Sequence, residues 1–563
     1  MTGRCCWINT LLMCCLTLPR AGAAQHTDSA AFAAAVRELD PQLGTPLARR
    51  GVAGGHASLR ELYGSAAAGG PMHPIWTVDG RPTPQAVAVV ALLATVDARG
   101  LRPADYDALP LGASAAALAE RPETGSASLA RFDFALSSAV MRLVADLHGG
   151  RTDPGPLRFA IPQTHEQLDL AHLVLEVSRA GDPATAIAAV EPRYAGYAAL
   201  VAALARYRAV AADLAVVPPR FSSLPVRPGE ALADHSALRR MLIALGDLPA
   251  SEEDREAGDT SSYSPDLVAG IARFQRRHAL AADGLIDKET ARQLGVPIAA
   301  RVRQIALTLE RWRWLPDTPP DRYAVVNIPG FQLLVFEHDS LAARPVLEMS
   351  VIVGRAAGRH GTPVFSGMID EVVFRPYWDV PSSIARKELL PRARRQPGVL
   401  RAEGFEIVGA GDEAKPVALT ADNVERVAAG TLRLRQRPGA TNALGLAKFV
   451  FPNSHAVYLH GTPAPELFAR ERRDFSHGCI RIADPAAFAQ HLLDGQGEWT
   501  RDAIESAMQG QRTIRVPVAR PVAVYILYAT VTARADGVRF YPDIYGHDAL
   551  LARALERQRR GGR

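Results

Sequence analysis

The sequence predicts a multidomain α+β protein in which helical domains come first and a β-rich domain follows. A chain of 563 residues is too long to fold around one hydrophobic core, so several domains are expected. In the first part apolar residues recur every three or four positions, as on one face of a helix, whereas from Tyr323 onward they alternate, as in strands. A proline-rich stretch at Val217–Pro228 separates two of the helical parts.

The composition divides the chain into successive parts. Apolar stripes in the first helical part need partners to bury them, and no catalytic constellation occurs there, so we predict a scaffold. A polar, arginine-rich, helical insertion interrupts the β-rich domain and would form a cap over it. The predicted parts are a signal peptide at 1–24, a helical scaffold domain at 25–230, a small helical module at 231–297, a bridging helix at 298–320, a β-rich domain at 321–520 with the cap insertion at about 382–440, and a C-terminal strand and basic tail at 521–563.

Strands are predicted where valine, isoleucine and aromatic residues alternate with other side chains between Pro-Gly and charged turns. They are expected at Tyr323–Ile328, Gln332–Glu337, Val346–Gly354, Ile369–Arg375, Ala456–His460, Cys479–Ile482 and Val522–Val531.

The first residues have the order of a secretory signal peptide. Arg4 precedes the apolar run Cys5–Leu18, and a proline and small residues follow, with cleavage expected near Ala23 or Ala24. The alternative is an uncleaved anchor, but an apolar run of about fourteen residues is shorter than the roughly 20 that span a bilayer. Four of the five cysteines lie in this segment. Cys479 would then be the single thiol of the exported protein, either buried as a structural residue or kept for its chemistry.

The net charge gives no indication of a nucleic-acid partner. The formal charge of +5 falls to about +3 when Arg4 and Arg20 leave with the signal peptide, which is small for a chain of this size. We therefore expect no nucleic-acid binding.

The small helical module carries a recognisable motif in its second half. Phe-Gln, a spacer, Asp-Gly, an aliphatic residue and Thr follow in that order, and the pattern resembles the widespread peptidoglycan-binding helical module. Asp287 stands where that family commonly has glycine, and a helical spacer that binds no ligand is the alternative. The peptidoglycan-binding residues implied by the resemblance are Phe274, Gln275, Asp283, Gly284 and Thr290.

The most informative motif pairs a histidine with a cysteine late in the β-rich domain. His460 precedes, by a short spacer, the run Ser476–Ile482, which reads Ser-His-Gly-Cys-Ile-Arg-Ile. Side chains alternate along a strand, so Cys479 and Arg481 would face a cleft while the isoleucines beside them enter the core. Nucleophilic chemistry at this cysteine is therefore expected.

A thiol with the usual pKa of about 8.5 needs an imidazole nearby to attack at neutral pH. His460 and His477 are both candidates, and we favour His460 as the base, with His477 shaping the site. A backbone carbonyl near Gly461 can orient the imidazole without any Asp or Asn. Gly478 permits an unusual backbone angle or a close approach of substrate.

The same segment resembles the catalytic domain of L,D-transpeptidases, which is defined by a histidine, a spacer and Ser-His-Gly-Cys followed by Arg or Asn. The similarity is to the large, multidomain, Gram-negative branch of this family and covers nearly the whole chain. It includes segments that begin at Glu310, Val326, Thr362, Pro376, Asn442 and Phe540. Gly461 stands where we expect an acidic residue after the histidine.

The resemblance implies a two-step acyl transfer on peptidoglycan in the periplasm. Cys479 would attack the amide before the terminal D-alanine of a tetrapeptide stem, and the side-chain amine of a second stem would resolve the thioester into a 3-3 cross-link. No cofactor or metal is implied, carbapenems should acylate the thiol, and other cell-wall synthesis enzymes are possible partners.

Further residues are expected around this pair. Charge develops on the carbonyl oxygen during attack, so backbone N–H groups are expected to face it. Arg481 either holds a substrate carboxylate or braces the loop. The predicted oxyanion donors are Gly478, Cys479 and Gly461, the supporting residues are Ser476, His477 and Arg481, and the cleft wall is expected to contain Tyr458, Trp378 and Asn442.

Three other interpretations use the same residues. If water or a lipoprotein lysine resolves the thioester, the protein is an L,D-carboxypeptidase or an anchoring transpeptidase. A zinc site would draw on His455, His460, His477 and Cys479, but zinc ligands usually have tighter paired spacings. In a non-catalytic wall-binding scaffold, the thiol would be inert.

Overall fold

The computed structural model describes residues 55–64 and 73–561, with gaps at 123–124, 162–166, 251–261, 338–343, 358–359, 412–414 and 535–536, and a few residues between 31 and 38. The predicted signal peptide lies outside the described residues. Within the described ranges, no helix has the length and apolar character needed to cross a membrane.

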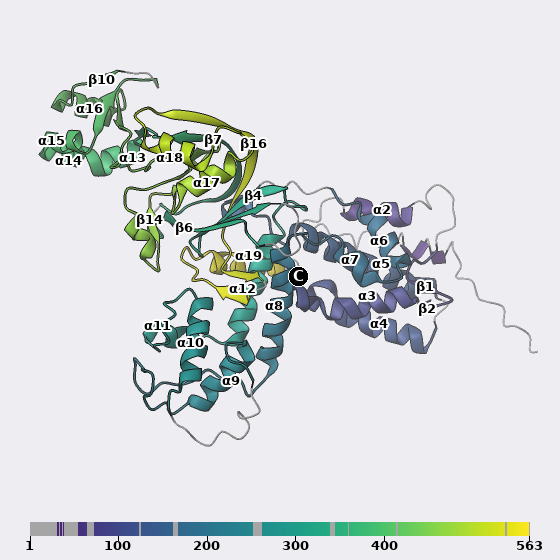
Figure 1. Cartoon of the computed structure of the whole chain (residues 1–563). Coiled ribbons are helices and arrows are strands. Elements are labelled where there is room, and N and C mark those ends of the chain that lie inside the picture. Colours follow the sequence, from purple (N-terminus) through teal and green to yellow (C-terminus); the bar gives the residue numbers. More distant parts are fainter. Residues whose placement is uncertain are drawn as a thin grey trace, which may run out of the picture.

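The first domain is a helical bundle, as predicted, and stands on one side of the molecule (Figure 1). Its central helix is almost wholly buried, and Asp133 on that helix accepts hydrogen bonds from the backbone N–H groups of Ile75 and Trp76 and from the hydroxyl of Tyr63. The helices are α2 (Gly55–Gly64), α3 (Pro84–Ala94), α4 (Ala108–Glu120), α5 (Ser126–Gly149), α6 (Leu170–Arg179) and α7 (Pro183–Ala188).

Helix α8 (Ala195–Ala212) follows the bundle but shares the core of the later domains. Its buried residues Tyr197, Leu200 and Leu204 belong to one hydrophobic cluster with the module and the β-rich domain, whereas α3 to α6 form a separate cluster. The predicted bridging helix, α12 (Ile298–Trp312), lies beside α8 (Figure 1). The two helices therefore join the bundle to the rest of the chain.

In its described residues the small module has three helices, α9 (His235–Leu245), α10 (Pro265–Arg277) and α11 (Lys288–Leu294). The two apolar stripes predicted on α9 and α10 are buried, which confirms them. Their residues are Leu238, Met241, Leu242 and Leu245, then Leu267, Ile271 and Phe274. The end of the predicted linker belongs to this module, because Val226 forms a β-bridge with Ile286.

The β-rich domain is a sheet that closes on itself. Its strand order runs β12-β13-β15-β6-β5-β4-β16-β7, and β12 also pairs with β7, so the ring is complete. Closure removes exposed edges and leaves one apolar interior. The strands are β4 (Arg322–Asn327), β5 (Gln332–Glu337), β6 (Leu347–Gly354), β7 (Val364–Phe374), β12 (Ala447–Val450), β13 (Leu459–His460), β15 (Ile480–Ile482) and β16 (Ile514–Leu527); β3 (Phe159–Ala160) extends the sheet beside β7, and β14 (Asp474–Ser476) pairs with β6.

Three predicted strands differ clearly from the observed ones, and the first of them, expected at Ile369–Arg375, begins earlier, at Val364. The strand expected at Ala456–His460 is shortened to β13, because Asn453 accepts hydrogen bonds from the backbone N–H groups of His455 and Val457 and so holds a turn there. The strand expected from Val522 begins earlier, since β16 starts at Ile514 and runs without a break past the predicted domain end at residue 520.

The insertion was predicted to be helical, but it also contains a four-stranded sheet in the order β10-β9-β11-β8. Its own hydrophobic cluster includes Leu390, Leu400 and Ile407, so it is a subdomain with a separate core. Figure 1 shows this cap at the end of the molecule away from the bundle. Its elements are β8 (Trp378–Asp379), α13 (Ser382–Ile384), a π-helical turn (Ala385–Leu389), α14 (Leu390–Arg395), α15 (Pro397–Ala402), β9 (Phe405–Val408), β10 (Pro416–Val417), α16 (Ala421–Ala429) and β11 (Arg433–Gln436).

The C-terminal residues are more ordered than the predicted basic tail. A hairpin of β17 (Val531–Arg534) and β18 (Gly537–Phe540) leads to helix α19 (His547–Gly561). Arg311 of α12 forms an ion pair with Asp548 of α19 at 2.6 Å, which fastens the last helix to the centre of the molecule.

Candidate active site

Cys479 directly precedes β15 and is partly exposed. Ile480 and Ile482 are fully buried, whereas Arg481 between them is only partly buried. The alternation predicted for this segment is therefore confirmed. Gly478 has a φ of 126°, in the region that favours glycine, and so turns the chain into the strand.

His460 ends β13, the strand beside the one that Cys479 precedes. The two strands pair in parallel, with Leu459 opposite Ile480 and His460 opposite Arg481. His460 is 4% exposed, and its Nδ1 lies 2.6 Å from the carbonyl oxygen of Gly461. A carbonyl only accepts, so Nδ1 carries the proton and Nε2 is the nitrogen that can act as a base. The predicted orienting carbonyl is thus that of Gly461.

Electrostatics leave the thiol and the imidazole neutral at neutral pH. Burial raises the pKa of Cys479, although hydrogen bonds from Tyr458 and the charges of Lys448 and Arg481 oppose the rise. Burial, with the charge of Arg481 next, lowers the pKa of His460 to about 3. The proton must therefore pass from sulfur to imidazole during attack rather than before it.

The loop before the cysteine is held by hydroxyl groups. Ser476 Oγ donates to the carbonyl of Cys479 at 2.5 Å and accepts from the N–H of Gly478 at 3.1 Å. Thr362 Oγ1 donates to the carbonyl of Gly478 at 2.8 Å and accepts from the N–H of Gly354 at 2.9 Å. A side chain at Gly354 would collide with the carbonyl of His360. Sequence reasoning assigned no role to Thr362 or Gly354, although Thr362 begins one of the segments that resembled the family.

His477 points to the cap. Its Nε2 lies 2.6 Å from Glu388 Oε1 in the π-helical turn and 2.6 Å from Arg355 Nη2. This ring therefore joins the motif loop to the cap, while His460 lies on the neighbouring strand, opposite Arg481. The arrangement favours the predicted division of roles between the two histidines.

The cleft-wall candidates separate in the structure. Tyr458 is hydrogen bonded to Cys479 and to the side chain of Trp378 on the cap strand β8. Asn442 is fully buried, and its side-chain amide donates to the carbonyls of Pro376, Gln436 and Arg437. Asn442 does not line a cleft, because every polar atom of its side chain holds the turn beneath the cap; its Oδ1 accepts from the N–H of Leu444.

Two of the three expected oxyanion donors are already engaged. The N–H of Gly461 donates to the carbonyl of Ala447 at 2.9 Å, and that of Gly478 to Ser476 Oγ. Within the part of the chain that the structure describes, the N–H of Cys479 is the remaining donor. The prediction is corrected accordingly for Gly461 and Gly478.

Four of the five motif residues of the small module, Phe274, Gln275, Gly284 and Thr290, are buried, whereas Asp283 is exposed. Gln275 is 2% exposed, donates to Asp283 Oδ1, to the carbonyl of Leu285 and to Thr290 Oγ1, and accepts from the N–H of Gly284. Phe274 and Thr290 are each 1% exposed. The four buried residues are therefore part of the module's internal framework, and only Asp283 is exposed. Asp287, the departure from the family, accepts from the N–H of Thr290 and caps α11.

Among the described residues, no group of three or more His, Cys, Asp or Glu side chains is arranged to hold a metal ion. His455, which the zinc interpretation required, packs its ring against Phe365 with the centroids 4.9 Å apart.

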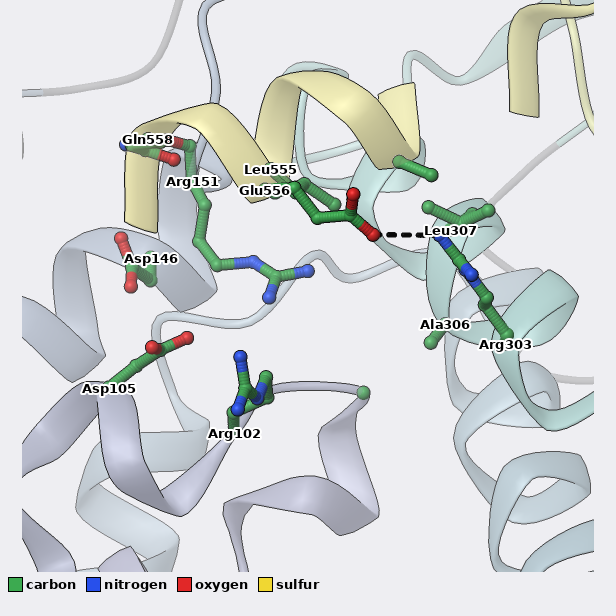
Figure 2. Close-up of a pocket in the computed structure, with 12 residues that line it drawn as sticks. Arg102, Asp105, Asp146, Arg151, Arg303, Ala306, Leu307, Leu555, Glu556 and Gln558 are labelled. Atoms are coloured by element: carbon green, nitrogen blue, oxygen red, sulfur yellow. Dashed lines mark hydrogen bonds and ion pairs between the residues drawn. The ribbon is translucent and has the colours of Figure 1, made fainter. Parts of the chain in front are cut away.

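A cavity of about 340 Å³ lies away from this site, between the bundle, α12 and α19. Figure 2 shows Arg102 and Arg151 pointing into it, with Arg303 paired to Glu556 at 3.2 Å. Arg151 also pairs with Glu310 at 3.0 Å. The lining contains arginines and carboxylates but no nucleophile, so the chemistry of the molecule is to be sought at Cys479.

The closed sheet, its cap and the Cys–His pair define a class of protein, and comparison with known families identifies it. Residues 321–515 match the model of the L,D-transpeptidase catalytic domain, residues 58–204 that of a scaffold domain, and residues 233–294 that of a "Putative peptidoglycan binding domain". The β-rich domain of this chain therefore belongs to the L,D-transpeptidase catalytic family, and a peptidoglycan-binding domain precedes it, as predicted.

Part of the chain is also similar to a curated protein. A protein of Haemophilus influenzae named "Putative L,D-transpeptidase" is 30% identical over 250 residues. The match covers 44% of this chain and 49% of that relative, so it spans about half the length of each.

Proposed function

We propose that this chain is a periplasmic L,D-transpeptidase that forms 3-3 peptidoglycan cross-links through a thioester on Cys479. The observation that carries the proposal is the arrangement of Cys479 and His460 on paired strands, with Nδ1 of His460 committed to a carbonyl and Nε2 left as a base. The family of the domain supports acyl transfer, and the peptidoglycan-binding domain supports a cell-wall substrate.

Acylation uses the groups in their neutral forms. The sulfur of Cys479 attacks the carbonyl carbon of the amide before the terminal D-alanine while its proton moves to His460 Nε2. The N–H of Cys479 faces the charge that develops on the carbonyl oxygen. Collapse of the intermediate breaks the C–N bond, and D-alanine leaves with the proton from His460.

The second step regenerates the enzyme. The side-chain amine of another stem attacks the thioester carbon and loses a proton to His460, and the sulfur leaves and is reprotonated. The cap next to Tyr458 and Trp378 favours a second stem as acceptor, because it shields the thioester while a bulky partner docks. Export by the N-terminal segment would deliver the protein to this substrate.

Incubation of the purified protein with disaccharide tetrapeptides, followed by mass analysis of the products, tests the proposal. We expect cross-linked dimers and released D-alanine, and neither product with Cys479→Ala. Tripeptides without dimers would assign water as the acceptor and make the protein a carboxypeptidase. Unchanged tetrapeptides would favour a wall-binding scaffold.

A further inference from the structure

Three side chains form a row across neighbouring strands of the active-site sheet. Lys448 on β12 lies opposite His460 on β13, and His460 lies opposite Arg481 on β15. Directly opposed residues share a face of the sheet. Ala447 and Phe449 beside Lys448 are fully buried, so Lys448 points to the other face, the one that Cys479 also shares with Arg481.

The two cations in this row have no carboxylate partner. Within the described residues, neither Lys448 nor Arg481 forms an ion pair, and Arg481 Nε is buried without a hydrogen-bond partner. The carboxylates whose charges reach Lys448, Asp379 and Glu371, are already paired with other arginines at 2.9 and 2.8 Å.

Elsewhere most buried arginines are paired with carboxylates, and Arg301, which is not, donates to the side chains of Gln293 and Gln304. Arg313 forms an ion pair with Glu310, Arg277 with Asp247, and Arg435 with Glu406. A half-buried cation without a counter-charge loses hydration that no ion pair restores. Two of them beside the nucleophile therefore indicate a site prepared for an anion. Lys448 Nζ is held 4.2 Å from the centre of the Tyr458 ring, which stacks the ammonium next to the residue that contacts Cys479.

We propose that Lys448 and Arg481 together bind the terminal carboxylate of the donor peptide, next to the amide that Cys479 attacks. This inference rests on the proposed function and names the substrate group that its site recognises. Cys479 and Arg481 are two residues apart, about 6.6 Å along a strand. In the donor the carboxylate carbon is only three bonds from the carbonyl carbon under attack, so a peptide bound at the thiol places its terminal carboxylate at the row.

Binding there would also prepare the base. The charges of Arg481 and Lys448 both lower the pKa of His460, which lies between them. A carboxylate seated at the row opposes those charges and strengthens His460 as a base when a substrate with a free carboxyl end is present. A peptide that lacks this group would leave the base weak, so selection and activation depend on the same contact.

The test pairs one protein change with one substrate change. Acylation rates would be measured for wild type and Lys448→Met on tetrapeptide donors that end in a free carboxylate or in a carboxamide. We expect kcat/KM of Lys448→Met to fall about 10- to 100-fold on the carboxylate donor, as for loss of a charge-assisted hydrogen bond. On the carboxamide donor the two proteins should react equally slowly. Lys415→Met, an exposed lysine of the cap, is the matched control and should behave as wild type on both donors.

An equal loss on both donors would overturn the proposal, because Lys448 would then act on the fold or on the thiol. A third donor tests whether Lys448 binds a different carboxylate, the side-chain carboxyl of residue three, which is amidated in this donor. If only this amidation removes the effect of Lys448→Met, the terminal carboxylate is not the ligand.

Binding separates this inference from the proposed function. Calorimetry with Cys479→Ala and with Cys479→Ala/Lys448→Met, on the carboxylate and carboxamide donors, needs no turnover. Carboxylate-dependent affinity that disappears with Lys448 would support the subsite even if wild type gave no product. If wild type turns over and the two variants bind the carboxylate donor with equal affinity, the proposed function is supported and the carboxylate subsite is contradicted.

Discussion

The motif of the small module and the motif of the catalytic domain are both visible in the sequence, yet the polar groups of their central residues are used differently. Gln275 is buried, and its side-chain amide bonds only to groups within the module. Cys479 and Arg481 instead face outward, and Arg481 keeps an unused donor. Residues of a sequence motif can therefore either stabilise a fold or form a reactive site. The two cases differ in whether the polar side chains keep donors without a hydrogen-bond partner, as Arg481 does.

The largest expected effect removes the nucleophile. Cys479→Ala should abolish acyl transfer without loss of folding, because the thiol faces the cleft while Ile480 and Ile482 fill the core. Dimer yield from tetrapeptides and circular dichroism measure the two properties. Activity near that of wild type would show that this motif is a framework like that of the module.

The second effect separates the two histidines of the catalytic motif. His460→Ala should slow single-turnover acylation by about 10² to 10⁴, the contribution of a positioned general base. His477→Ala should lose much less, because its ring contacts Glu388 and Arg355 at the cap. The reverse order would move the role of base to His477.

These two regions also show how far sequence reasoning reaches. Alternation placed Cys479 and the isoleucines correctly, and the need to orient an imidazole led to the carbonyl of Gly461. Both depend on local geometry. Asn442 was misplaced because its burial depends on the cap sheet, whose strands pair residues distant in sequence. Lys448 was missed for the same reason, since only the register of β12 brings it beside His460.

A third prediction concerns the framework motif. Gln275→Leu should destabilise the module by about 1 to 3 kcal/mol, the cost of leaving buried partners such as the N–H of Gly284 unsatisfied. Thermal unfolding measures this change. Arg276→Ala, at the exposed neighbouring position, is the control and should leave the stability unchanged.

Binding to sacculi tests the same residue in a second way. If Gln275 were a ligand contact, Gln275→Leu would weaken binding to sacculi at a temperature where the module remains folded, with no change in stability. Acylation of small soluble stems should be unaffected in either case, because the module contributes no reactive group to the site.

The smallest expected effect is an absence of pH dependence, and it follows from the burial of His460. The base works only when neutral. Its pKa in the free enzyme is lowered to about 3, so protonation removes activity only as the pH approaches that value. The second-order rate constant for acylation by a carbapenem reports the free enzyme and should change little between pH 7 and pH 5. A histidine with an ordinary pKa of about 6.5 would lose roughly 20-fold over that range.

Intact-mass measurements of the single carbapenem adduct, timed at each pH, give the rate constant, and Cys479→Ser, carried through identically, checks that sulfur carries the adduct. An acid limb with a midpoint near pH 6 to 7 would mean that His460 is solvated or that another group is the base. A rate constant that does not change with pH would mean that burial has a different role in each of the two motifs. In the module it encloses the hydrogen bonds of the Gln275 side chain, whereas in the catalytic domain it holds a base neutral until substrate arrives.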